Sequence, residues 1–410
     1  MRRLLVVSTV YVDPANRGKL RALAAQGLDV TVAVPQRWRE PALGRVILTP
    51  WERQGGVEVF PIPCSHPGDD LECRLGRRPL LSLLHDKRPD LVQIEAEPDS
   101  ALAIQVSKAA RRLRIPVVVF AWDGASRPGA FARWRRRRVL KRLVGALAGS
   151  EATRERLLSE RPDLAVAVVP QLGVTMPTQP EHLPHEGLAV GHVGRLVAHK
   201  GVDTLLQALA LNREAPWHLT VVGDGPEREK LERLATDLRL AARIRWRGAL
   251  PPEELALVWQ ALDVLVVTPE GVTTRSEQSG HALAEAMAHE VAVVVSETGV
   301  LPEVVDTAGV VIPPNDATAL AEVLRRLGDP AVRLPLVQAA RARALRKFSD
   351  EAVAERMLRF LNEVTTPRVA DPGAAPRGDT TPGDDETAHD DATVNPGPPA
   401  RGQPRLGASD

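Results

Sequence analysis

The sequence has 410 residues, enough for two domains and an extension, and 44% of them are hydrophobic, so large cores can be buried. The net charge of +1 argues against a protein that binds nucleic acid in bulk, and no stretch reaches the roughly 18 apolar residues of a membrane span. Cys64 and Cys73 fit neither a metal pattern nor a disulfide framework, which favours a reducing, cytoplasmic environment. The apolar run near the start predicts a buried strand rather than a signal peptide, because a helical pattern follows it at once.

The first 170 residues alternate short β-branched runs with helical patterns. Strands are predicted at 3–9, 29–34, 57–62, 90–95, 116–121, 144–148 and 166–169, and helices at 18–27, 78–88, 99–113, 130–143 and 151–160. Alternation of this kind predicts a parallel sheet with helices on both faces. Continuous apolar runs such as 117–120 are typical of strands that are buried on both sides.

A second cycle of the same kind follows the proline-rich segment 170–184, which is a poor candidate for regular structure. Strands are predicted at 188–193, 218–222, 243–246, 263–267, 291–295 and 309–312, with helices between them. We therefore predict an α/β protein with two doubly wound, Rossmann-like domains, an N-terminal one at 1–172 and a C-terminal one at 186–347. Ser349 and Asp350 are predicted to cap a last helix that ends near residue 364.

The composition changes at residue 366. The segment 366–410 contains eight prolines, six glycines, eight acidic and four basic residues, and it has no aromatic residue and no helical period. Such a segment cannot bury enough apolar surface to offset the entropy lost on ordering. It is predicted to be a disordered acidic tail.

The stretch 277–285, Glu-Gln-Ser-Gly-His-Ala-Leu-Ala-Glu, is the most informative in the chain. It predicts a helix that starts at 279–281, with Glu277 in the loop before it and Glu285 about a turn and a half inside it. The first amides of a helix lack internal partners and carry the positive end of its dipole, so they suit a diphosphate. Because carboxylates bind sugar and ribose hydroxyls well, the stretch predicts a nucleotide-sugar site; the alternative is an amphipathic helix with two surface glutamates.

Two loops after predicted strands add to this site, because ligands of open α/β sheets bind beyond the carboxyl ends of strands. The loop 194–201 carries Arg195, a planar fork of donors, and Lys200, a mobile point charge, which together suit a diphosphate. The alternative is a pair of solvated loop cations. In the next loop, Gly223 and Asp224 form either a wall of the site or a plain turn with Asp224 as a cap.

With these pieces the chain resembles the retaining glycosyltransferases of family 4, which have the GT-B fold. The resemblance covers roughly residues 1–364, is strongest from 188 to 330, and rests on the segments 194–201, 221–227, 263–266, 277–280, 285–288 and 302–305. It implies two domains that face each other across a cleft and a helix at 348–365 that returns to the N-terminal domain. It also implies transfer from a nucleotide-sugar donor without a metal or a cofactor, and no Asp-x-Asp follows a strand of the folded body.

The roles of individual residues follow from the same resemblance. The candidate donor-binding residues all lie in the C-terminal half: Arg195, Lys200, Gly223, Asp224, Gly280, His281, Ala282 and Glu285. Catalytic roles fall on Arg195 and Lys200, which would stabilise the leaving nucleoside diphosphate, and on Glu277 beside the donor sugar. Glu285 would hold the ribose hydroxyls, and the leaving phosphate itself would take the proton of the acceptor.

The N-terminal half is expected to hold the acceptor. Its candidate residues are Gly18, Glu95, Glu97, Trp122 and Asp123. Gly18 is the one glycine after the first strand that could allow a close backbone approach, where many relatives have a Gly-Gly pair. Glu95 and Glu97 follow a predicted strand and would face the cleft, unless they are a solvated loop end or a cap. Trp122 stands where many relatives have histidine, and it either stacks on a sugar face or packs.

The run 133–142 carries seven basic residues around Trp134. It is either an exposed helix face or a surface that docks on anionic lipid at the inner face of the plasma membrane. No motif or aromatic-interleaved patch indicates nucleic acid.

The function expected from all of this is transfer of a hexose from a GDP- or UDP-sugar to a glycan or lipid-linked acceptor. The alternatives on the same fold are a nucleotide-sugar epimerase and a non-catalytic nucleotide-sugar-binding protein.

Overall fold

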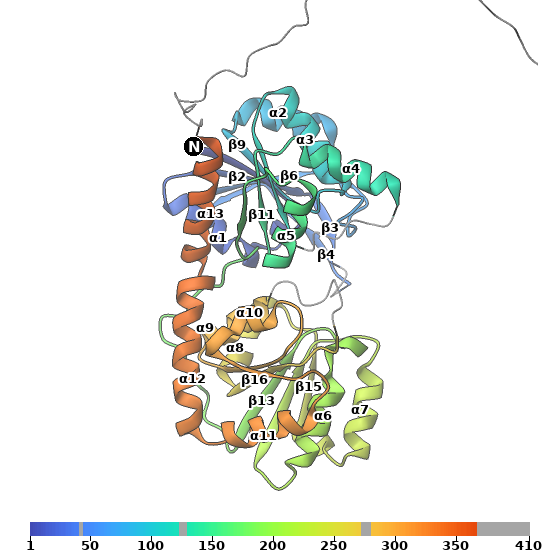
Figure 1. Ribbon diagram of the computed structural model, residues 1–410, viewed down its shortest axis with the longest axis vertical. Coiled ribbons are helices and arrows are strands. Elements are labelled where there is room, and N and C mark those ends of the chain that lie inside the picture. The colour runs from blue at the N-terminus through green and yellow to red at the C-terminus, as the bar shows by residue number, and fades with distance from the viewer. Residues whose placement is uncertain (41–43, 123–128, 272–279, 367–410) are drawn as a thin grey trace, which may run out of the picture. The chain divides into compact units, whose positions relative to one another are not determined.

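The computed structural model describes residues 1–40, 44–122, 129–271 and 280–366 (Figure 1). Two expected site residues, Glu277 and Asp123, lie outside these ranges, and so does the tail from residue 367 onwards. Within these ranges no helix is both long enough and apolar enough to cross a membrane.

The N-terminal sheet has eight strands in the order β12-β11-β10-β9-β1-β2-β6-β5. Their bounds are β1 Arg3–Ser8, β2 Asp29–Pro35, β5 Glu52–Gln54, β6 Val57–Ile62, β9 Leu91–Glu95, β10 Val117–Ala121, β11 Gly145–Ala148 and β12 Val166–Val168. All neighbours are parallel except the edge strand β5, which runs antiparallel to β6. The chain reverses its direction of winding between β1 and β9, so the loops after these two strands flank a crevice.

The C-terminal sheet has six parallel strands in the order β15-β14-β13-β16-β17-β18. Their bounds are β13 Leu188–Val193, β14 Trp217–Val222, β15 Ile244–Gly248, β16 Val264–Val267, β17 Ala292–Ser296 and β18 Val310–Ile312. This is the strand order of dinucleotide-binding folds, and its switch point lies between β13 and β16. The predicted α/β class with two doubly wound sheets is therefore confirmed.

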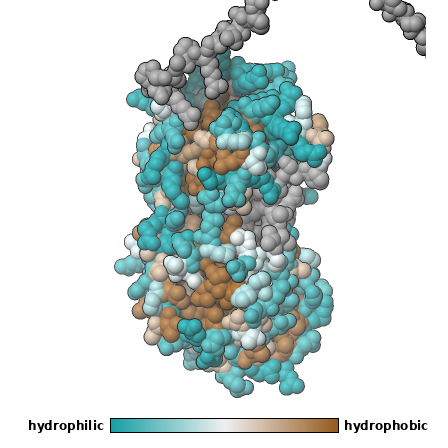
Figure 2. All heavy atoms as spheres, in the orientation of Figure 1, coloured by the Kyte–Doolittle hydropathy of each residue, from teal (hydrophilic) through white to brown (hydrophobic). Residues whose placement is uncertain are grey.

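Helices cover both sheets. In the N-terminal half they are α1 Gly18–Ala25, α2 Arg77–Lys87, α3 Ala101–Arg112, α4 Ala130–Leu140 and α5 Glu151–Glu160. In the C-terminal half they are α6 Val202–Leu211, α7 Arg228–Asp237, α8 Pro252–Gln260, α9 His281–Ala288, α10 Leu301–Val305, α11 Ala317–Leu327 and α12 Pro330–Arg343. Two apolar clusters fill the two faces of each sheet. Figure 2 shows hydrophilic residues over most of the face in view, with apolar residues gathered in both its upper and its lower part.

The segment between β2 and α2 contains strands that the sequence did not predict. Besides β5 they are β3 Arg37–Arg39, β4 Val46–Leu48, β7 Cys64–Ser65 and β8 Arg74–Leu75. They were missed because two or three residues are too few for a period of two to stand out. The predicted helix 130–143 is also shorter than expected, since α4 ends at Leu140.

The last helix, α13 Asp350–Thr365, begins where the sequence predicted, because the Ser349 side chain accepts a hydrogen bond from the Ala352 amide at 3.1 Å. A short π-helical segment, Ala344–Phe348, joins it to α12. The apolar face of α13 belongs to the same core cluster as β1 and α1, and Met357 and Leu361 are fully buried there. The N-terminal core is therefore completed by the end of the folded chain.

Candidate functional site

The switch point of the C-terminal sheet is built from close backbone contacts between loops. Gly223, after β14, has φ +131°, and a Cβ atom there would lie 1.8 Å from the carbonyl oxygen of Gly194. Gly201, before α6, has φ +63°, and its Cβ would lie 1.9 Å from the carbonyl oxygen of Thr268. Only glycine fits at these two points, because a side chain would collide with backbone that cannot move aside. The loops after β13, β14 and β16 are thus locked together.

Two cations lie on the first of these loops. Arg195 is exposed and Lys200 is partly buried. Burial and the charge of Arg195 lower the pKa of Lys200 to about 8. Two positive charges that raise each other's energy in this way make a seat for an anion, because an anion between them removes the repulsion.

His192, which was not among the expected site residues, lies on β13, the strand that leads into this loop. It is buried on β13, and its Nδ1 donates a hydrogen bond of 3.4 Å to the carbonyl of Val266 on β16. Burial, then the charge of Lys200, lowers the pKa of His192 to about 4, so its ring is neutral near pH 7. Because His192 stands within a continuous apolar run, its sequence context does not indicate a place beside the cationic loop.

Helix α9 starts at the place predicted for the phosphate seat. Gly280 precedes it with φ +53°, and a Cβ at Gly280 would lie 2.7 Å from a methyl group of Val304. Among the described residues, the N-cap position is held by Gly280, which has no side chain to cap the amides of this first turn. His281 is the first residue of α9, and Glu285 lies one turn later. The two side chains approach each other with 3.5 Å between Nε2 and Oε1. Glu285 thus lies on the same face of α9 as His281, the first residue of the helix.

Asp224 is exposed and closes its own turn. Its Oδ1 accepts a hydrogen bond of 2.8 Å from the Gly225 amide, and its Oδ2 lies 3.5 Å from the Arg228 guanidinium. Asp224 thus contacts its own turn, but the N-cap position of α7 is held by Glu227. Gly223 beside it is required by the contact with Gly194.

Glu95, expected to face the cleft, is instead fully buried at the end of β9. Its Oε1 accepts hydrogen bonds from the Tyr11 hydroxyl at 2.8 Å, from Lys19 Nζ at 3.1 Å and from the Gln93 amide at 2.9 Å. Its Oε2 accepts one from the Gln171 amide at 3.3 Å. The carboxylate is neither a solvated loop end nor exposed to a ligand, because its partners surround it.

Gly18, expected to allow a ligand close to the backbone, makes room for a side chain of this protein. A Cβ on Gly18 would lie 2.1 Å from Oδ2 of Asp350, the first residue of α13. The Asp350 carboxylate also accepts a hydrogen bond of 2.9 Å from the Thr175 hydroxyl. The position after the first strand is therefore filled by the returning helix.

Glu97 and Trp122 meet at the ends of β9 and β10. The Trp122 amide donates a hydrogen bond of 3.0 Å to Glu97, and the Trp122 carbonyl accepts one of 2.9 Å from the Thr153 hydroxyl. Glu97 is buried, and its other oxygen lies 3.8 Å from the Arg136 guanidinium.

The basic run 133–142 is not a uniformly exposed face. Arg136 is fully buried and donates a hydrogen bond of 2.7 Å to Glu160, and Arg135 is buried within 3.4 Å of Glu72. These two cations are used inside the N-terminal half. On the outer side of α4, Phe131 and Trp134 are exposed by 69% and 49%, and their rings stack with centroids 5.7 Å apart.

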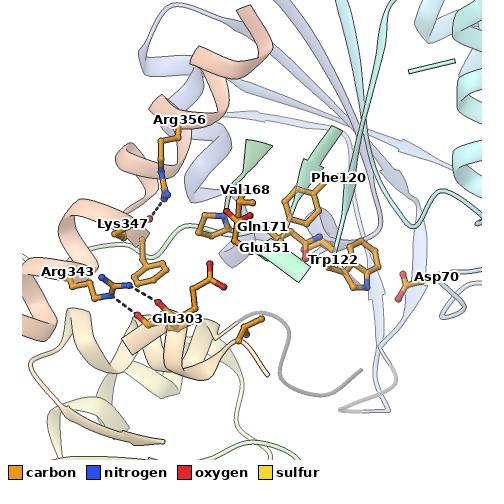
Figure 3. A pocket seen from close by; sticks show the side chains of 16 residues that line it. Asp70, Phe120, Trp122, Glu151, Val168, Gln171, Glu303, Arg343, Lys347 and Arg356 are labelled. Carbon is orange, nitrogen blue, oxygen red and sulfur yellow. Dashed lines mark hydrogen bonds between the residues drawn. The ribbon is translucent and has the colours of Figure 1, made fainter. Parts of the chain in front are cut away.

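A cavity of about 520 Å³ lies between the strand ends of the N-terminal sheet and α10 (Figure 3). Its polar lining includes Asp70, Trp122, Glu151, Gln171 and Glu303. Of these, only Trp122 was named beforehand as an acceptor-side candidate. Asp70 lies in the segment without a readable period, whereas Glu303 stood in the 302–305 motif without an assigned role.

No group of three or more His, Cys, Asp or Glu side chains that could hold a metal ion occurs within the described ranges.

Two doubly wound sheets, each with a crevice at its switch point, are characteristic of glycosyltransferases of the GT-B fold. The profile of the Glycosyl transferase 4-like domain matches residues 14–171, and that of the Glycosyl transferases group 1 matches residues 178–343. Together the two profiles span most of the chain, which belongs to the glycosyltransferases that they describe. The resemblance to GT-B glycosyltransferases is therefore confirmed.

Two curated relatives are similar to about half of the chain. The chain is 32% identical over 212 residues to a D-inositol 3-phosphate glycosyltransferase of Corynebacterium jeikeium, which is 49% of this chain and 48% of that protein. It is also 32% identical over 233 residues to a 2-deoxystreptamine glucosyltransferase of Streptomyces kanamyceticus, which is 52% of this chain and 57% of that protein. The chain thus spans about half the length of the curated relatives it matches.

A solved structure, HepE of Anabaena in complex with UDP-glucose, superimposes with a TM-score of 0.63 at 18% identity. The superposition covers 88% of this chain and 100% of that one. At this identity the likeness concerns the fold.

Proposed function

We propose that this protein transfers a hexose from a nucleotide-diphosphate sugar to a hydroxyl of a glycan or lipid-linked acceptor, with retention of configuration. The observation that carries the proposal is the pair Arg195 and Lys200, held by glycine contacts at the switch point, with the Lys200 pKa lowered to about 8 beside Arg195. A donor diphosphate would relieve the repulsion between the two cations and favour the charged form of Lys200.

The same groups account for the chemistry. The bond between the anomeric carbon and the phosphate oxygen breaks, and the acceptor oxygen bonds to that carbon from the same face. The acceptor proton passes to the departing phosphate oxygen, so no strong protein base is needed. Arg195, Lys200 and the first amides of α9, at Gly280 to Ala282, stabilise the charge that develops on the leaving group. Glu277 is proposed to lie beside the donor sugar, and no metal or cofactor takes part.

A UDP-sugar is the first donor to test, because HepE, which shares the fold, is known with UDP-glucose bound. A GDP-sugar remains the second candidate, since the diphosphate and ribose contacts proposed here do not depend on the base. Glu285 would accept hydrogen bonds from the ribose hydroxyls.

The test is a titration of UDP and GDP by calorimetry. Arg195→Ala and Lys200→Ala should each weaken the preferred nucleotide about 30- to 100-fold, because each removes a hydrogen bond between charged groups. Lys230→Ala, which removes an exposed cation paired with Glu227 on α7, is the control and should leave the affinity unchanged. Equal affinity in all three variants would remove the diphosphate assignment.

Two other functions on the same fold give different products. A nucleotide-sugar epimerase would release or isomerise sugar without an acceptor, and a non-catalytic binding protein would do neither. Donor consumption with and without an acceptor preparation separates them: the proposed transferase consumes donor faster when the acceptor is present.

Peripheral contact of the protein with the inner face of the plasma membrane is part of the proposal for a lipid-linked acceptor. It is supported by the exposed aromatic pair Phe131 and Trp134 and by Arg138, whose guanidinium lies 4.7 Å from the Trp134 ring centroid. Vesicles with anionic lipid should bind the protein, and Trp134→Ala with Arg138→Ala should weaken that binding about tenfold. Equal binding to neutral vesicles would contradict it.

A further inference from the structure

The charges around the 520 Å³ cavity select among chemical classes of acceptor. Its lining contains three carboxylates: Asp70 from the loop between β7 and β8, Glu151 from α5 and Glu303 from α10. Trp122 supplies an aromatic wall between Asp70 and Glu151 (Figure 3). A carboxylate accepts hydrogen bonds from hydroxyls and ammonium groups, and it repels a phosphate.

Glu303 is one of the exposed carboxylates of this lining. It stands on α10, and its side chain rises toward Glu151 (Figure 3). Within the described part of the chain it accepts no side-chain hydrogen bond and forms no ion pair, although Lys347 and Arg343 act on it from a distance. Partial burial, then repulsion from Glu151, raises the pKa of Glu303. Two carboxylates that repel each other across a cavity are stabilised by a cation between them.

Two of the cations that line the cavity, Arg343 and Arg356, form hydrogen bonds with other groups of the protein. The three guanidinium nitrogens of Arg343 donate to the Val304 carbonyl, to the Glu303 carbonyl and to Asp306, at 2.7 to 2.8 Å. Arg356 donates to the carbonyls of Ala352 and Lys347. These acceptors leave the positive charges in place but occupy most of the donor nitrogens of both groups, so a phosphate gains few hydrogen bonds from them.

Of the remaining charged groups, Lys347 is exposed, and one oxygen of Glu151 lies 3.3 Å from the Arg154 guanidinium. Asp70, at the other end of the cavity, accepts a hydrogen bond of 2.6 Å from the Thr9 hydroxyl. Burial raises the pKa of Asp70, and the Thr9 hydroxyl opposes this shift. The Asp70 carboxyl supplies oxygen acceptors to the same lining as Trp122.

We infer that the acceptor is a hydroxylated ring that carries one or more ammonium groups, and that Glu303 and Glu151 bind them while Trp122 lies against the ring. The inference rests on the proposed function, since it takes the cavity as the place of the acceptor. It separates two chemistries that relatives of this chain use, an inositol phosphate and an aminocyclitol.

Three six-membered carbocycles of different charge test it. The full-length protein, saturated with UDP or GDP, is titrated by calorimetry with 2-deoxystreptamine, which is a dication, with neutral myo-inositol and with anionic inositol 3-phosphate. The dication should bind about tenfold more tightly than the neutral ring, and the phosphate should bind most weakly. In the double variant Glu303→Gln with Glu151→Gln the preference should fall to within about twofold.

The matched control is Glu155→Gln, an exposed glutamate one turn further along α5, which should keep the full preference. Tighter binding of inositol 3-phosphate than of 2-deoxystreptamine would overturn the inference, and so would a preference that survives in the double variant. The nucleotide titration keeps this result apart from the proposed function: if neither UDP nor GDP binds, the transferase proposal fails first, whereas normal nucleotide binding with no preference for the amine removes the acceptor class alone.

Discussion

The two halves share one topology but treat the charges at their switch points in opposite ways. In the N-terminal half, Glu95 is buried and surrounded by four donors of the protein, among them Lys19. In the C-terminal half, Arg195 and Lys200 share a loop and repel each other. In one crevice a buried carboxylate is enclosed by partners of the protein, whereas in the other two cations lie on one loop. The position of a polar residue at the end of a strand therefore does not by itself indicate a ligand-binding site.

The largest test of this comparison removes the buried cation. Lys19→Met leaves Glu95 charged and without its ion pair in a fully buried place, so we expect a loss of about 3–5 kcal/mol in the free energy of unfolding, measured in urea. UDP or GDP affinity of the folded fraction should not change. The double variant Lys19→Met with Glu95→Gln should recover part of the stability; a stable single variant that loses activity would instead assign the network a role in catalysis.

The second test acts on the other half. Gly223→Ala places a methyl group 1.8 Å from the Gly194 carbonyl in a left-handed backbone, so we expect a loss of about 2–3 kcal/mol in stability together with weaker nucleotide binding. Gly27→Ala is the control, because Gly27 also has a positive φ but nothing lies within 4 Å of its Cβ position. It should cost about 1–2 kcal/mol and leave nucleotide affinity intact. Identical behaviour of the two variants would show that the close contact has no part in the site.

The third test concerns the ribose. Glu285→Ala should weaken UDP or GDP about tenfold, because it removes hydrogen bonds from hydroxyls to a charged acceptor. Inorganic pyrophosphate lacks the ribose and should bind the variant and the parent protein equally well. A parallel loss for pyrophosphate would place Glu285 with the phosphates instead.

The smallest effect is a dependence on pH. Lys200 has a pKa of about 8 in the free protein, and a diphosphate favours its charged form. Nucleotide affinity should therefore be constant just below pH 8 and fall about tenfold as the pH rises from 8 to 9.5, since the charge is lost in that interval. In Lys200→Arg the guanidinium stays charged, so the affinity should be flat over the same range. A parallel decline in this variant would exclude Lys200 as the titrating group.

Sequence patterns located most of the fold because its determinants are local. The long apolar runs correspond to the buried strands, and the glycines of the C-terminal loops stand within a few residues of the strand ends they serve. The pair Arg195 and Lys200 could be found in the same way, since both residues lie on a single loop.

The N-terminal half was harder because its determinants are distant in sequence. Tyr11, Lys19 and Gln171, the partners of Glu95, are separated from it by at least 76 residues. Arg136 was expected at the surface because a charged residue in a basic run is normally solvated, and only the fold brings Glu160 and Glu97 to it.

The position of α13 has a consequence for biosynthesis. Because Met357 and Leu361 fill the core beside β1, the half that leaves the ribosome first cannot be completed until synthesis has passed those residues. During that interval the nascent chain exposes an apolar groove next to its first strand, and it depends on chaperones or on speed to avoid association with other chains. A truncated protein that stops before residue 350 would retain this groove permanently.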